Sequence, residues 1–181
     1  ELFLIIFNLS FLSIMLFVKS HAILSNGNKI CALALIITAG LVHSTPVKSD
    51  PVINGFYTSN EFTAFFKMLV LFLSSVILYL SDTYLKKNNL LKYEFPLLIN
   101  FSVFGMMIVI SSNDLMTLYL GIEIQSLSLY IIAAYRRDNL KSTEAGLKYF
   151  ILGALSSGLL LYGISLVYGA TGSTQFHTIY S

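Results

Sequence analysis

The stretch that decides the fold is ISSNDLMTLYLGIEIQSLSLYIIAAYRR, residues 110–137. Residues 115–135 contain a single charged side chain, and about 20 such residues are what an α-helix needs to cross the hydrocarbon of a bilayer. Asn113 and Asp114 can cap the start of this helix, and two arginines follow its end. The stretch therefore predicts a transmembrane helix with Glu123 near its middle.

The composition of the whole chain agrees with a membrane protein. Of 181 residues, 56% are hydrophobic and 11% are charged, against about a quarter charged in soluble domains. The net charge of +2 gives no electrostatic case for a nucleic-acid partner. A single cysteine, Cys31, excludes a disulfide within the chain and any iron–sulfur or structural zinc site that needs several of its thiolates. We therefore expect no metal or cofactor site in this chain.

Apolar runs predict one all-α bundle of six transmembrane helices, over residues 2–18, 28–43, 62–80, 95–110, 115–135 and 144–168. The inner loops are then 19–29, 81–94 and 136–143, and the long outer loop is 43–61. The second span is the weakest. Its uninterrupted apolar run, 30–42, has 13 residues and also suits an interfacial or buried segment.

Loop charges favour six crossings. Eight basic residues then share one side, against Lys48 alone on the other. The eight are Lys19, Lys29, Lys86, Lys87, Lys92, Arg136, Arg137 and Lys141. If the second run does not cross, the tally is six against three, which fits the positive-inside rule less well. Six spans place both ends of the chain on the outer side.

Three ionisable residues lie inside the predicted spans: Lys67, Glu123 and Lys148. A charge in a bilayer is costly, faces other helices or water, and often marks an ion path. Glu123 is the deepest, and Tyr119 at i−4 shares its helix face. Its structural alternative is a protonated glutamic acid that only bonds a neighbouring helix. Function is favoured, because lipid penalises a charge without a use.

The two lysines are less decisive from position alone. Lys148 lies near the start of its span, where a relay group and a snorkelling lysine paired with Glu144 are equally good interpretations. Lys67 lies five residues into its span, where snorkelling alone explains it. Small residues after Lys148, including the pairs Gly153 with Ser157 and Ala154 with Gly158, predict close packing of another helix.

Two segments carry a specific resemblance. Residues 110–137 and STEAGLKYFILGALSSGLLLYGISLVYGATG, residues 142–172, resemble the fifth and sixth helices of NADH dehydrogenase subunit 2, an antiporter-like membrane subunit of respiratory complex I. FTAFFKMLVLFLS, residues 62–74, is similar to the third helix of that family. EIQSL and EAGLKYF resemble the mitochondrial and bacterial forms, so the resemblance implies the mitochondrial inner membrane or, alternatively, a bacterial plasma membrane.

The resemblance implies proton translocation by a relay of buried glutamate and lysines. Glu123 matches the fifth-helix glutamate, Lys148 matches the sixth-helix lysine, and Lys67 matches a lysine of less certain role. NADH, FMN, iron–sulfur clusters and ubiquinone would be bound by other subunits of the complex. Two alternatives stay open: a scaffold that completes the membrane arm without its own proton path, and a subunit of a multi-subunit cation/proton antiporter.

Length is where the chain departs from the family. Members of the family have more helices, built as inverted repeats, and a later helix carries the lysine that pairs with the fifth-helix glutamate. The resemblance therefore implies that a second chain supplies the remaining helices, or that the sequence is a piece of a longer one. Other membrane-arm subunits and membrane lipid are the further partners that it implies.

Overall fold

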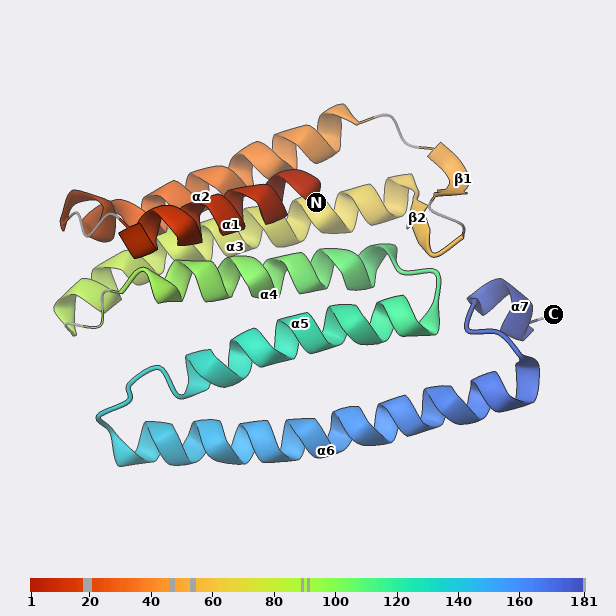
Figure 1. Ribbon diagram of the computed structural model, residues 1–181. Helices are drawn as coiled ribbons and strands as arrows, with labels where there is room; N and C mark the ends of the chain where they lie inside the picture. The colour runs from red at the N-terminus through yellow and green to blue at the C-terminus, as the bar shows by residue number, and fades with distance from the viewer. Residues whose placement is uncertain (18–20, 46–47, 53–54, 89, 91, 181) are drawn as a thin grey trace.

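The computed structural model describes residues 1–17, 21–45, 48–52, 55–88, 90 and 92–180. Lys19 and parts of the predicted loops 19–29, 43–61 and 81–94 lie outside these ranges. The described chain is a bundle of long helices with one small β-hairpin (Figure 1). Its elements are α1 (Leu2–Phe17), α2 (His21–Ser44), β1 (Lys48–Val52), β2 (Tyr57–Ser59), α3 (Glu61–Lys87), α4 (Glu94–Ser111), α5 (Leu115–Ala133), α6 (Leu140–Thr171) and α7 (Phe176–Tyr180).

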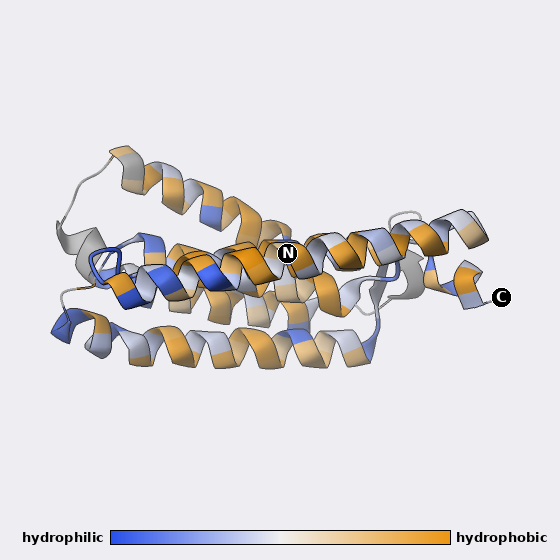
Figure 2. Cartoon of the chain, turned by 90° about the horizontal axis from the view of Figure 1, so that it is seen from below, coloured by the Kyte–Doolittle hydropathy of each residue, from blue (hydrophilic) through white to orange (hydrophobic). Residues whose placement is uncertain are grey.

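Successive long helices run in opposite directions, so their connections alternate between two ends of the bundle (Figure 1). The hairpin, the α4–α5 turn and α7 lie at one end, which we call the hairpin end. The α3–α4 and α5–α6 loops lie at the other, which we call the basic end because most of the arginines and lysines are there. Figure 2 shows hydrophobic residues along the helices, with the most hydrophilic ones mostly near helix ends.

The core of the bundle lies among α1–α4. Its buried cluster includes Leu35, Leu71, Leu78 and Met107, each with no exposed surface. α4 is central, because it contacts α1, α2, α3 and α5. Close van der Waals packing of such side chains favours the association of these four helices. α6 is different, because it packs mainly on α5 and leaves most of its surface exposed.

Five helices are long and apolar enough to cross a membrane among the described residues: α2 from Asn26 onward, α3, α4, α5 and α6. α1 is a shorter apolar helix that packs on α4 and α2. The expected all-α membrane bundle is therefore confirmed. The run that was weakest in the sequence, residues 30–42, belongs to the 24-residue helix α2.

Three helices extend well beyond the predicted spans. α2 begins at His21 instead of residue 28, so most of the predicted inner loop 19–29 is helical. α3 continues to Lys87 instead of ending at residue 80, and Lys86 pairs with Asp82 one turn earlier at 2.6 Å. α6 covers Leu140–Thr171 instead of 144–168, because Asn139 caps it by accepting a hydrogen bond from the Lys141 amide at 3.0 Å. Apolar runs marked only the hydrocarbon-crossing part of each helix, whereas ion pairs and caps carry the helix past it.

A hairpin lies where the sequence indicated only a turn-rich loop. β1 and β2 are antiparallel. Val52 is opposite Tyr57 and Lys48 is opposite Ser59, and the register shifts between these two pairs. Asn113 ties the hairpin turn to the α4–α5 turn: its amide donates to Phe56 O at 3.0 Å, and its side chain donates to Gly55 O at 2.9 Å. These backbone pairings need no hydrophobic alternation, so the sequence pattern could not show them.

Candidate proton-relay site

Glu123 is on α5, eight residues after its first residue, Leu115. As expected, Asp114 caps this helix: one carboxylate oxygen accepts from the amides of Met116 at 2.8 Å and Thr117 at 3.1 Å. At 1.5 Å per residue, Glu123 lies about 12 Å from the start of the helix. The helix therefore places a carboxyl group near the middle of an apolar segment.

The Glu123 carboxylate faces α6. The hydroxyl of Ser157 donates to Glu123 Oε2 at 2.9 Å, and the hydroxyls of Tyr119 and Ser157 are 3.0 Å apart. Three oxygen-bearing side chains thus form a continuous chain between two helices, and all three are half-buried. Tyr119 lies on the face of Glu123, as the sequence predicts, whereas the sequence predicts only helix packing for Ser157.

Two other polar neighbours of Glu123 on its own helix have different roles. The Ser126 hydroxyl donates to the backbone carbonyl of Glu123 at 3.1 Å and does not reach the carboxylate. Tyr130 packs edge-on against the rings of Tyr149 and Phe150 of α6. Of Tyr119, Ser126 and Tyr130, Tyr119 alone is linked to the carboxylate, through Ser157, among the described contacts.

A seam of small residues brings α6 close to α5. A Cβ atom at Gly153 would lie 2.0 Å from the Tyr130 hydroxyl, and one at Gly146 would lie 2.4 Å from the Ala134 Cβ. A Cβ at Gly158 would meet nothing within 4 Å. The Gly153–Ser157 pair therefore faces α5, while Ala154 and Gly158 are exposed. Close packing is confirmed for the first pair only.

Lys148 is not part of this cluster. Its ammonium group pairs with Glu144 at 2.6 Å, and the two side chains are 70% and 62% exposed. Lys148 precedes Ser157 by nine residues, which is about 14 Å along the helix axis. The pairing with Glu144 confirms the expected i, i+4 geometry. Lys148 does not contact Glu123 among the described contacts.

Lys67 lies in a separate cluster at the hairpin end. Its ammonium group is 2.8 Å from Glu1 Oε1 and donates to the Tyr57 hydroxyl at 2.5 Å. The Tyr57 hydroxyl in turn donates to Glu1. Burial, and then the negative charge of Glu1, raise the pKa of Tyr57 above its usual value. The sequence missed both partners, because a pairing across the first 67 residues leaves no periodic signal.

Asp82 is a further buried charge, and it lies in helix α3 and not in the predicted loop 81–94. It is 7% exposed, pairs with Lys86, and accepts a weak hydrogen bond from Asn28 of α2 at 3.4 Å. This trio joins α2 to α3 near the basic end. Among the described residues, no group of three His, Cys, Asp or Glu side chains is placed to hold a metal ion.

A hollow of about 430 Å³ lies about one helical turn from the Glu123 cluster, toward the hairpin end. Its lining is mainly apolar: Met116, Leu161, Ile164, Ser165, Tyr168 and Thr174. Met116 lies about one turn before Tyr119, and Leu161 lies about one turn after Ser157. The Tyr119–Ser157 pair is therefore between Glu123 and this hollow.

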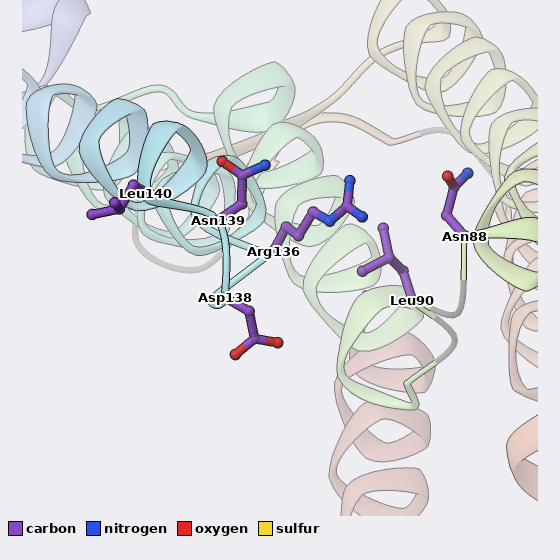
Figure 3. Close-up of a pocket in the computed structure, with 6 residues that line it drawn as sticks. All are labelled: Asn88, Leu90, Arg136, Asp138, Asn139 and Leu140. Carbon is purple, nitrogen blue, oxygen red and sulfur yellow. The ribbon is translucent and has the colours of Figure 1, made fainter.

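Another hollow, of about 500 Å³, opens at the basic end between the α3–α4 and α5–α6 loops. Figure 3 shows its lining residues, Asn88, Leu90, Arg136, Asp138, Asn139 and Leu140. The Arg136 guanidinium points toward the side of Asn88 and Leu90, and the Asp138 carboxylate points toward the bottom of the view, away from the guanidinium. Arg136 follows Glu123 by 13 residues, so this hollow is not part of the Glu123 cluster.

Known proteins resemble this chain in sequence. Residues 112–181 match the family model described as NADH:quinone oxidoreductase/Mrp antiporter, TM. NADH-quinone oxidoreductase subunit N of Rhodospirillum rubrum is 52% identical over 141 residues, which cover 78% of this chain and 28% of that protein. Subunit N of Paramagnetospirillum magneticum is 44% identical over 176 residues, covering 97% of this chain and 36% of that protein. The chain thus spans about a third of the length of these relatives.

Solved structures resemble its fold. A chain of respiratory complex I from Thermus thermophilus with bound aureothin matches with a TM-score of 0.78 and 27% identity, over 96% of this chain and 37% of that one. A chain of the membrane-bound sulfane sulfur reductase, an archaeal respiratory membrane complex, matches with a TM-score of 0.68 over 98% of this chain and 38% of that one. At 22% identity, the second likeness shows the fold alone. In sequence and fold, the chain belongs to the family of antiporter-like membrane subunits of NADH-quinone oxidoreductases, and it matches the N-terminal part of their subunit N.

Proposed function

We propose that this chain carries part of a proton path through the membrane arm of an NADH:quinone oxidoreductase, with Glu123 as the group that holds the proton. The observation that supports this most directly is the Glu123 carboxyl group itself, eight residues inside an apolar helix and hydrogen-bonded to Ser157 at 2.9 Å. A carboxyl group at this depth is costly, and such groups mark ion paths. The assignment to an NADH:quinone oxidoreductase is carried over from the relatives, which are named as subunit N of that enzyme.

Lys148 and Lys67 are the other members of the proposed relay. Lys148 is supported by its position on α6, the helix that also supplies Ser157, and by its ion pair with Glu144, a group that can also bind a proton. Lys67 has weaker support, because its contacts with Glu1 and Tyr57 also suit an anchor for the hairpin end. We place Glu123 first, Lys148 second and Lys67 last in this relay.

The remaining parts of the machine would lie outside this chain. NADH, FMN, iron–sulfur clusters and quinone would be bound by other subunits. The rest of subunit N, either from a second chain or from a continuation of this one, would supply the remaining helices and a lysine near Glu123. The membrane would be the mitochondrial inner membrane or a bacterial plasma membrane.

The test is a Glu123→Gln variant in the assembled complex. Gln keeps the size and most hydrogen bonds of the side chain but cannot bind and release a proton. General acid–base groups contribute about 10²-fold or more, so we expect proton pumping to fall by at least about tenfold. The readout is the initial rate of NADH-driven acidification in sealed vesicles, at equal amounts of assembled complex. Glu61→Gln, at an exposed residue in the first turn of α3, is the matched control. Unchanged pumping in Glu123→Gln would refute the proposal.

Two alternatives give different results. A scaffold without a proton path predicts that joint replacement of Glu123 and Lys148 by apolar residues changes assembly but not the number of protons pumped per NADH. The description of the matching family model also names the Mrp antiporter, which supports a cation/proton antiporter as the second candidate. Sodium-dependent transport by a complex that lacks NADH-oxidising subunits would favour it.

A further inference from the structure

The hydrogen-bonded chain at Glu123 has a direction along the membrane normal. Tyr119 precedes Glu123 by one helical turn, so it lies about 6 Å closer to the hairpin end, where α5 begins. Ser157 bridges the two, at 2.9 Å from Glu123 Oε2 and 3.0 Å from Tyr119 Oη. Farther toward the hairpin end lies the hollow of about 430 Å³, whose lining includes the hydroxyl-bearing residues Ser165 and Thr174.

Both hydroxyls can donate and accept, so this chain has two polarities. With Glu123 ionised, Tyr119 donates to Ser157 and Ser157 donates to the carboxylate. With Glu123 protonated, the carboxylic acid donates to Ser157 and Ser157 donates to Tyr119. The distances of 2.9 and 3.0 Å suit either arrangement.

We propose that Tyr119 and Ser157 form the port through which Glu123 exchanges its proton with water on the side of the hairpin end; this rests on the proton-carrying function proposed above. A hydronium ion that reaches Tyr119 Oη from the side of the hollow gives it a proton as the proton of Tyr119 moves to Ser157 Oγ and that of Ser157 moves to Glu123 Oε2. One proton enters, one is stored on Glu123, a water molecule is left, and the chain has reversed its polarity. Release runs by the same steps in reverse.

The choice of Ser157 over its neighbour is a feature of the α5–α6 packing. Ser156 and Ser157 are adjacent, so their side chains point about 100° apart around α6. Ser156 is exposed, while Ser157 is half-buried on the seam with Gly153. This pair of identical residues offers a matched control that tests position alone.

The test uses Ser157→Ala and Tyr119→Phe in the assembled complex, with Ser156→Ala and Tyr162→Phe as controls. Tyr162 is 64% exposed on the same helix as Ser157. Each port variant removes one hydroxyl, and the loss of one ordinary hydrogen bond corresponds to a factor of about ten in an equilibrium or rate constant. We expect NADH-driven pumping to fall about tenfold in both port variants, to be unchanged in both controls, and to be largely restored in Ser157→Thr.

A spectroscopic readout shows whether the Ser157 hydroxyl is bonded to the protonated carboxyl group of Glu123. In infrared difference spectra, the carboxylic C=O band that is absent from Glu123→Gln belongs to Glu123. We expect this band to move to higher wavenumber in Ser157→Ala, because the protonated carboxyl loses its partner. Wild-type pumping in both port variants would overturn the port, whether or not the band moves in Ser157→Ala. Failure of the proposed function is distinct, since it would leave pumping intact in Glu123→Gln itself.

Discussion

The Lys67 ammonium group lies 2.8 Å from the Glu1 carboxylate, and their side chains are only 8% and 21% exposed. Breaking a buried ion pair by removing one partner costs about 3–5 kcal/mol, because the other charge is left buried and unpaired. We therefore expect Lys67→Met to lower the thermal midpoint of the purified complex and to loosen the hairpin end. Limited proteolysis of the hairpin gives a local readout.

The matched control for this prediction is the joint replacement Glu1→Gln with Lys67→Met. Removing both charges leaves no unpaired one, so we expect the double variant to be more stable than Lys67→Met alone. A double variant that is no more stable would contradict the pairing. If Lys67→Met pumps normally at equal amounts of complex, Lys67 is an anchor and not a relay group.

Gly105 and Gly121 allow the close approach of α4 and α5. A Cβ at Gly105 would lie 2.7 Å from the Gly121 carbonyl oxygen and 2.7 Å from the Gln125 amide nitrogen, and neither backbone atom can rotate away. We expect Gly105→Ala to destabilise the chain by about 1–3 kcal/mol or more, as overpacking does, and to reduce the amount of assembled complex on native gels. Gly158→Ala, with nothing within 4 Å of its Cβ, should assemble normally. Equal assembly of the two variants would contradict the packing.

Gly153 links packing to the Glu123 cluster. It is one turn before Ser157, and its Cβ would lie 2.0 Å from the Tyr130 hydroxyl. Gly153→Ala should push α6 away from α5 and lengthen the Ser157–Glu123 hydrogen bond. We expect pumping to fall several-fold at equal assembly, whereas Gly163→Ala, which has open space around its Cβ, should have no effect. Normal pumping by Gly153→Ala would show that the cluster tolerates this displacement.

Tyr135 gives a prediction for alkaline pH. Burial, and then the Glu94 carboxylate, raise the pKa of Tyr135 to about 12. The folded value is raised above the value of about 10 in an unfolded chain. Its stabilising contribution is therefore full below pH of about 10 and is lost as the pH rises toward about 12. We expect Tyr135→Phe to reduce the loss of stability over this interval.

The measurement is an ultraviolet titration of the complex in detergent. The difference between wild type and Tyr135→Phe should be one tyrosinate component with a midpoint near pH 12. A component near pH 10, the usual midpoint of about 10 for an exposed tyrosine, would contradict the buried environment of this ring.

Features that depend on a single helix could be predicted from the sequence. Sequence reasoning placed Glu123 at the middle of α5 and the cap at Asp114, and both positions follow from residues along one helix. It also found the Glu144–Lys148 pair, because i, i+4 neighbours meet on any helix. Helix ends were less accurate, since caps and ion pairs carry α3 and α6 beyond their apolar runs.

Sequence reasoning failed where the rotation of one helix against another decides the contact. Ser156 and Ser157 are the same residue type, and nothing in the sequence tells which of them faces Glu123. The Lys67–Glu1–Tyr57 cluster depends on how the hairpin end closes over α3, which local periodicity does not encode. Asp82 falls in the predicted loop because a charged residue ends an apolar run. The run does not show that Lys86 of the same helix and Asn28 of α2 bind this carboxylate.

The packing of α6 has a mechanical consequence. Helices α1–α4 share a buried core to which α5 is joined by backbone-close packing, whereas α6 packs mainly on α5. The Glu123 carboxylate is on α5, which moves with the α1–α4 core, and its hydroxyl partner Ser157 is on α6. A shift of α6 away from α5 by about 1 Å along this bond takes a 2.9 Å hydrogen bond beyond the distance at which it counts as one. A force applied to the outer face of α6 thus reaches Glu123 across one interface, without any change inside the four-helix core.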